Sequence, residues 1–105
     1  MEQATTELPR WMLALDEEDV QFLKRFLLSS GSLKAVAEEY GVSYPTVRAR
    51  LDRLIEKVRV ADDPRIRDPF ERRVRMLVAD GELAAAHAKE LLEIHRSTSH
   101  RRNGP

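Results

Sequence analysis

The sequence predicts an all-helical fold, in which a helix-turn-helix core of three helices is followed by a C-terminal two-helix hairpin. Apolar residues recur at intervals of three and four, as on the buried face of a helix, and no stretch alternates with the period of a strand. Residues typical of helix starts and stops divide the 105-residue chain into segments of helical length. A hydrophobic content of 42% is ordinary for a globular protein and supports a core without disulfides.

The helix-turn-helix domain is expected over residues 8–60. A short helical turn at Pro9 precedes a first long helix, from about Asp16 to Ser30, with Asp16 as its N-cap. Ser32 is suited to cap a second, short helix that ends at Gly41. These signals predict two helices in quick succession before the third.

The third helix is expected from Ser43, its N-cap, to about residue 60, because Pro45 falls in the first turn, where a missing N–H costs nothing. Its predicted buried stripe comprises Val47, Leu51, Leu54, Ile55 and Val58.

The remaining residues predict a linker over 61–68, a helical hairpin over 69–96 that turns near Gly81, and a disordered tail over 97–105. Leu83 is expected on the last helix, which should fade near His95. Two short amphipathic helices cannot bury their apolar faces against each other alone. The hairpin must therefore dock on the core or on the same hairpin of a second copy, and we favour the homodimer.

The spacing of residues 33–54 indicates a helix-turn-helix. Ala37 supplies the small side chain that two steeply crossing helices need at their closest approach, and Gly41 tolerates the backbone of a tight turn. Val42, Val47 and Leu51 should anchor the following helix, whose other face then stays exposed. In such motifs the N-terminal end of the second helix enters the DNA major groove.

The exposed side chains around that helix start are of the types that contact DNA. Arg48 is the first candidate for reading a base, because a guanidinium can bond both guanine O6 and N7. The predicted DNA-binding residues are Lys34, Ser43, Tyr44, Thr46, Arg48, Arg50 and Arg53, with Lys34, Arg50 and Arg53 on the phosphate backbone. The structural alternatives are a solvated arginine face paired with Asp52 and Glu56, and a Tyr44 that covers the edge of the core.

The distribution of charge agrees with this assignment more than the total does. The chain has 18 basic and 18 acidic residues, but residues 44–60 carry five basic and two acidic side chains, whereas residues 1–43 carry four basic and eight acidic ones. Zero net charge and an acidic first third favour an alternative function, a protein-interaction module that binds a sigma-like factor or another regulator.

Three stretches resemble the bacterial family called domain of unknown function two-zero-eight-nine (DUF2089): residues 8–11 (LPRW), 27–34 (LLSSGSLK) and 41–52 (GVSYPTVRARLD). The resemblance covers about residues 8–60 and implies a helix-turn-helix regulator of transcription. Many members carry an N-terminal zinc ribbon, which this cysteine-free chain lacks. Residues 74–83 (VRMLVADGEL) and Leu91–Leu92 resemble SHOCT-like C-terminal helical hairpins.

Catalysis and cofactors are not expected. No nucleophile, acid–base pair or glycine-rich phosphate loop is grouped in the sequence, and His87 and His95 lie eight residues apart, not the four that place two metal ligands on one turn. With no leader and no long apolar run, we expect a cytoplasmic protein without a membrane partner. The expected partner is duplex DNA.

Overall fold

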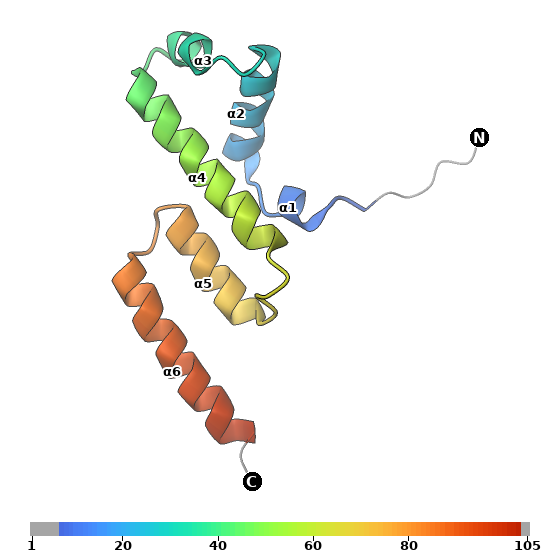
Figure 1. Cartoon of the computed structure of the whole chain (residues 1–105), viewed down its shortest axis with the longest axis vertical. Coiled ribbons are helices and arrows are strands. Elements are labelled where there is room, and N and C mark those ends of the chain that lie inside the picture. Colours follow the sequence, from blue (N-terminus) through green and yellow to red (C-terminus); the bar gives the residue numbers. More distant parts are fainter. Residues whose placement is uncertain (1–6, 104–105) are drawn as a thin grey trace, which may run out of the picture.

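A computed structural model describes residues 7–103 of the chain, and the side chains of residues 7–99. Helices are the only regular secondary structure in that range, which confirms the all-α prediction (Figure 1). Their bounds are α1 (Arg10–Leu13), α2 (Glu17–Leu28), α3 (Leu33–Tyr40), α4 (Tyr44–Asp62), α5 (Pro69–Ala79) and α6 (Ala85–Asn103). None of the helices described is both long and apolar enough to cross a membrane.

Side-chain caps start the helices where the sequence predicted them. The Asp16 carboxylate accepts a hydrogen bond from the Asp19 amide at 2.8 Å, and the Asp19 carboxylate accepts one from the Asp16 amide at 3.1 Å, which together form a capping box at α2. The Ser32 hydroxyl caps α3 and the Ser43 hydroxyl caps α4, each by accepting a hydrogen bond from the backbone amide three residues later. Gly41 ends α3 with a φ of 70°, a left-handed conformation that favours glycine.

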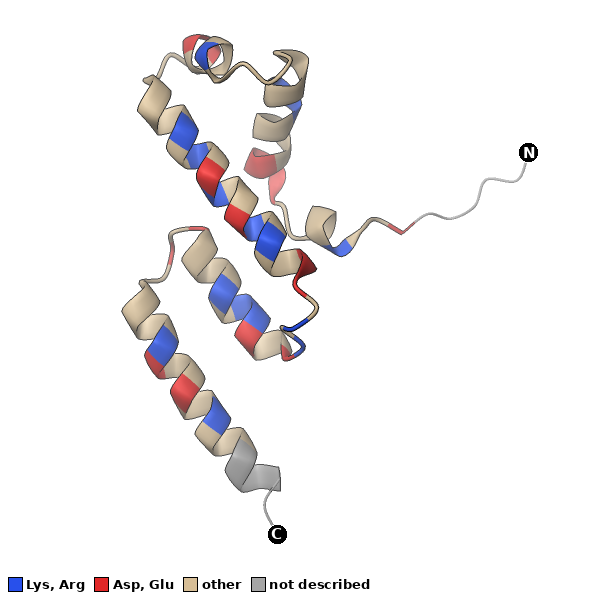
Figure 2. Cartoon of the chain, in the orientation of Figure 1, with Lys and Arg blue, Asp and Glu red and all other residues tan. Residues whose placement is uncertain are grey.

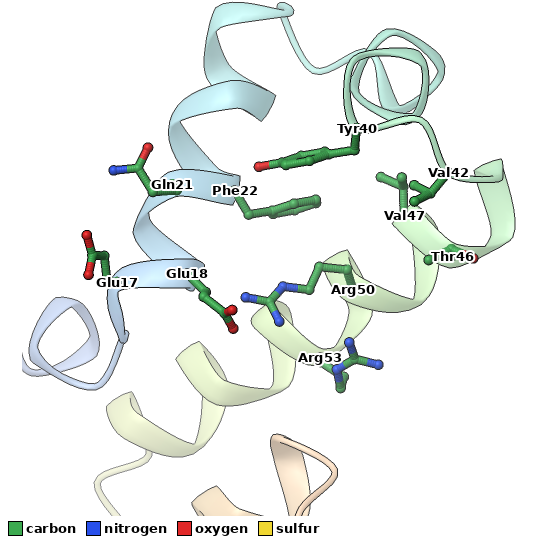
Figure 3. Close-up of a pocket in the computed structure, with 10 residues that line it drawn as sticks. All are labelled: Glu17, Glu18, Gln21, Phe22, Tyr40, Val42, Thr46, Val47, Arg50 and Arg53. Carbon is green, nitrogen blue, oxygen red and sulfur yellow. The ribbon is translucent and has the colours of Figure 1, made fainter.

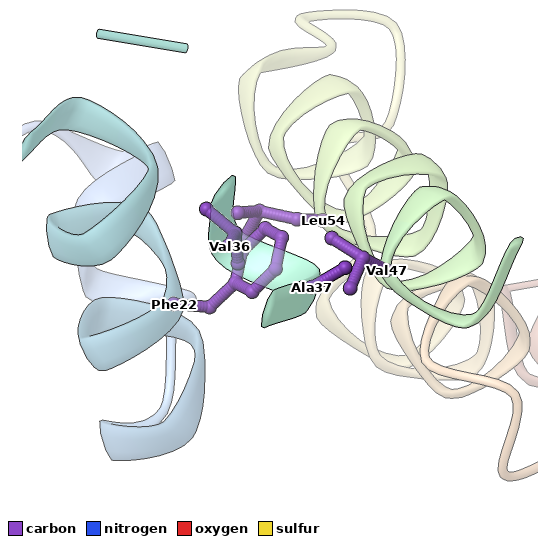
Figure 4. Packing of buried hydrophobic residues seen from close by; sticks show 5 residues of the cluster. All are labelled: Phe22, Val36, Ala37, Val47 and Leu54. Carbon is purple, nitrogen blue, oxygen red and sulfur yellow. The ribbon is translucent and has the colours of Figure 1, made fainter. Parts of the chain in front are cut away.

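The core lies where α2, α3 and the first half of α4 meet. Phe22, Val36, Ala37, Val47 and Leu54 are buried together, with Ala37 at the approach of α3 to α4 as predicted (Figure 4). Two predicted core residues are exposed instead, Val42 and Ile55. Ile55 lies about 100° around α4 from buried Leu54, which turns it to solvent.

The segment expected to be a linker is a packed part of the fold. Helix α4 continues to Asp62, and both Ala61 and Ile66 are buried. The Arg72 guanidinium of α5 donates hydrogen bonds to the Val60 carbonyl at 2.9 Å, to the Ala61 carbonyl at 3.0 Å, and to the Ile66 carbonyl. Two of these carbonyl groups belong to the last turn of α4 and the third to the connection, so the bonds tie α5 to both.

The hairpin docks on its own chain through one helix. Helix α5 packs on α4, and α6 packs on α5 around a small second cluster of Val74, Ala88 and Leu92. The molecule is accordingly flat, with extents of 58 × 47 × 18 Å.

The last helix differs from its predicted bounds at both ends. It begins at Ala85, and Leu83 lies in the preceding turn while still packing on the second cluster. The predictions that it fades near His95 and that residues 97–103 are disordered are wrong, because α6 runs to Asn103. No Gly or Pro interrupts residues 85–103, so polarity alone did not end the helix. Residues 104–105 of the predicted tail lie outside the described range.

Candidate nucleic-acid interface

The N-terminal half of α4 projects past the hairpin, which packs farther along the helix (Figure 1). Val47 faces the core while Tyr44, Thr46 and Arg48 are exposed. Tyr44 is 52% exposed. This half of α4 has the open face that a recognition helix needs.

Two hydroxyl groups define the start of that face. The Ser43 Oγ and Thr46 Oγ1 atoms lie 2.8 Å apart, and Ser43 Oγ also accepts a hydrogen bond from the Thr46 amide at 3.3 Å. Both residues are exposed. Their capping bonds hold the hydroxyls in place and leave lone pairs or protons available to a ligand.

Arg48 is the basic side chain at the centre of the open face. Its Nε atom lies 3.4 Å from an Asp52 carboxylate oxygen one turn along the helix, and both side chains are more than half exposed. An exposed pair of this kind contributes little to stability, so a base or phosphate can replace Asp52 at small cost. Lys34, at the start of α3, is exposed as well.

Arg50 is placed differently from the prediction that it holds the DNA backbone. Its Nη2 atom lies 3.2 Å from the Asp19 carboxylate, and only 25% of its side chain is exposed. Arg48 and Arg50 are separated by about 200° around α4, so Arg50 points towards α2 and away from the face that carries Arg48. This assignment does not fit the geometry; Arg50 joins α4 to α2.

Arg53 lies on the flank of α4, next to the turn between α5 and α6. Its Cδ atom is 3.6 Å from the point where a Cβ on Gly81 would stand. With Arg50 and Thr46 it lines a pocket of about 570 Å³ between α2 and α4, whose apolar wall includes Phe22 and Tyr40 (Figure 3). Arg53 is exposed but does not share a face with Arg48.

A buried ionic network beneath this interface was not predicted. Asp19 and Lys57 are each 2% exposed, and the Lys57 ammonium donates a hydrogen bond to Asp19. The same ammonium lies 3.3 Å from Asp80, at the end of α5, and 3.8 Å from Asp16. Through Lys57 the network joins α2, α4 and α5, so it fixes the hairpin relative to α4.

The sequence contained a signal for this network. Lys57 follows Leu54 by three residues and precedes Ala61 by four, so helical spacing alone places it on the buried stripe of α4. A lysine there needs buried carboxylates, and only the tertiary structure shows which ones.

The charges of the network shift two pKa values in the directions that favour ionised groups. Burial opposes the charge on Lys57, but the hydrogen bond from its ammonium to Asp19 and the charge of that carboxylate raise its pKa overall. The amide of Asp19, which donates to Asp16, lowers the pKa of Asp16 against the effect of burial, and the Lys57 charge adds to this.

Comparisons with known proteins agree with the fold of this region. No curated protein and no solved structure matches the chain. Residues 15–61 match the family described as "Domain of unknown function (DUF2089)-HTH", which takes in α2, α3 and all but the last residue of α4. The match does not extend over the hairpin, so its SHOCT-like character stays a prediction. Residues 15–61 are thus similar to the DUF2089 helix-turn-helix family.

Proposed function

We propose that the protein is a regulator of transcription that binds duplex DNA through the N-terminal half of α4. The observation that carries this proposal is the open face of α4, where Ser43, Tyr44, Thr46 and Arg48 are exposed on a helix anchored by Val47 and Leu54. Arg48 reads a base, and Ser43 and Thr46 contact phosphates or base edges. Lys34 contacts the backbone, and Arg53 meets a phosphate on the flank of the groove.

Selection of bound sequences from a random duplex library, followed by fluorescence anisotropy on the enriched site, tests the proposal. We expect Arg48→Ala to relax the preference at one or two base pairs and to weaken binding by about 1–3 kcal/mol. Lys34→Ala should weaken all sequences alike and reduce the salt dependence. Arg59→Ala is the matched control, because Arg59 is an exposed arginine of the same helix beyond the open face, paired with Glu56 at 3.0 Å. Equal effects of Arg48→Ala and Arg59→Ala would contradict the assignment.

The protein is further proposed to act as a homodimer joined through α6. This helix places Ala88 and Leu92 on α5 and leaves Leu91 and Ile94 exposed on its other side, with Ile94 56% exposed. The same stripe of a second copy would bury Leu91 and Ile94, which the second cluster leaves exposed. Helix-turn-helix proteins commonly bind two half-sites as symmetric dimers. Sedimentation should show a dimer that Ile94→Asp converts to monomer, whereas Glu93→Asp has no effect; a wild-type monomer would refute the proposal.

A second candidate function is binding of another protein, such as a sigma-like factor, instead of DNA. It is favoured by ion pairs on α4, where Arg48 lies 3.4 Å from Asp52 and Arg59 lies 3.0 Å from Glu56. Figure 2 shows acidic residues interspersed with the basic ones along this helix. The apolar pocket of Figure 3 could accept a partner's side chains. If no sequence is enriched and binding to DNA vanishes as salt rises, this function replaces the first.

A further inference from the structure

Four arginines from three separate segments lie around one hollow at the C-terminal end of α4, away from the open face of its N-terminal half. Arg10 comes from α1, Arg67 from the connection after α4, and Arg72 and Arg73 from α5. They line one hollow of about 690 Å³, and every charged residue in its wall is an arginine. Figure 2 shows basic residues on α1, on the connection and on α5 around the C-terminal end of α4.

The four side chains divide into one fixed and three available cations. Arg72 is held by the carbonyl groups that end α4, including those of Val60 and Ala61. Arg10, Arg67 and Arg73 are exposed, and within the described part of the chain no ion pair includes them. By contrast, the neighbouring Arg65 is paired with Asp63 at 2.9 Å. Guanidinium groups that line one hollow and form no ion pair within the described residues are suited to bind phosphate groups.

The rest of the wall is apolar and consists of Pro64, Ile66, Pro69 and Met76. Ile66 is buried and forms a firm floor. A ligand that carries phosphates next to a flat organic group can place the phosphates on the arginines and the flat group on this floor. That combination of charges and surface is the chemistry of a nucleotide.

The position of the hollow separates it from the DNA proposed above. From Ser43 to Asp62, α4 rises about 28 Å along its axis. A major groove is only about 8.5 Å deep, so a helix that enters it by its N-terminal end carries its C-terminal end well clear of the duplex. A duplex held by the N-terminal end of α4 would therefore leave this hollow open to a free ligand.

We propose that Arg10, Arg67, Arg72 and Arg73 form a binding site for a small phosphorylated ligand of the nucleotide class. Arg10, Arg67 and Arg73 bind the phosphates, while Arg72 shapes the site and adds its positive charge. The site does not depend on DNA binding by α4. Because α5 carries Arg72 and Arg73 and is joined to α4 through Lys57, a bound ligand touches the same hairpin that the buried network fixes.

Isothermal titration of the full chain with pyrophosphate and with ADP, at low salt and without divalent cations, tests this site. We expect both probes to bind, ADP more tightly because of the apolar floor, with affinity falling as salt is raised. Arg67→Gln and Arg73→Gln should each weaken binding about tenfold, the effect of losing one charge-assisted bond. Arg59→Gln, on an arginine outside the hollow, should change nothing. Circular dichroism shows whether each variant keeps its fold.

Several results would overturn the proposal. One is the absence of binding by either probe at millimolar concentration, and another is equal loss in Arg59→Gln and Arg67→Gln. A third concerns the source of the phosphates. The double variant Arg67→Gln/Arg73→Gln could weaken duplex binding as much as Lys34→Ala does, while pyrophosphate and ADP fail to bind the wild type. In that case the arginines contact the nucleic-acid backbone instead. A failure of the protein to bind DNA would leave the titration with pyrophosphate and ADP unaffected.

Discussion

Replacement of Lys57 by methionine isolates the contribution of the buried network to stability. Methionine has a similar length and no charge, so the substitution removes the ammonium while filling most of its space. In the wild type this ammonium bonds to Asp19 and lies 3.3 Å from Asp80 and 3.8 Å from Asp16. Lys57→Met therefore leaves a buried carboxylate without its main cation.

The expected loss follows from the partners that remain. Breaking a buried ion pair by removing one member costs about 3–5 kcal/mol. Asp19 keeps Arg50 at 3.2 Å and the Asp16 amide at 3.1 Å, and the 22% exposed Asp80 side chain is partly solvated. We therefore place the loss at the lower end, about 3 kcal/mol, a large part of the stability of a domain of this size.

Urea unfolding followed by circular dichroism measures the effect, and a double-mutant cycle assigns its cause. Asp19→Asn removes the carboxylate charge that Lys57→Met leaves without its cation. The double variant should therefore be more stable than the sum of the two single losses predicts, by at least about 1 kcal/mol. Lys24→Met, on an exposed lysine of α2, controls for the loss of a positive charge. Single losses that add up to the loss of the double variant, or a Lys57→Met variant as stable as Lys24→Met, would show that the buried network does not stabilise the fold.

Three further predictions concern local features of the fold. Gly41→Ala places a Cβ at a φ of 70° with no atom nearby to collide with, so backbone strain alone should cost about 1 kcal/mol in thermal unfolding; a neutral result would contradict the left-handed turn. Ser32→Ala removes the cap of α3 and should cost about 1 kcal/mol in urea unfolding, while Ser30→Ala, outside the cap, serves as comparison. Acid should destabilise the protein, because two carboxyl groups have a pKa below the ordinary value of 3.8. The hydrogen bond from the Asp19 amide lowers the pKa of Asp16, and the hydrogen bond to His95 lowers the pKa of Asp68. Their stabilisation is present above pH 3.8 and is lost as pH falls through the lowered values; a free energy of unfolding that is flat below pH 4 would exclude this.

Local signals in the sequence were enough to predict the helix-turn-helix. Caps at Asp16, Ser32 and Ser43 and the stop at Gly41 depend on interactions within a few residues, and each appears in the structure as predicted. The end of α6 was missed because polar residues such as Ser97 do not terminate a helix by themselves.

Side-chain direction across helices was harder to predict. Arg48 and Arg50 look equivalent in sequence, yet one is exposed and the other bonds to Asp19, because two residues along a helix turn by about 200°. The packed connection over 61–68 depends on Arg72 reaching back to the carbonyl groups of α4, a contact between segments that no local pattern encodes.

The central claim, sequence-specific binding of DNA by the open face of α4, is tested most directly by selection from a random duplex library with the wild-type protein and with Arg48→Ala. We expect an enriched motif for the wild type, with two inverted half-sites about one helical turn apart for a dimer, and a motif degenerate at one or two base pairs for the variant. No enrichment, or the same motif from both proteins, would contradict it.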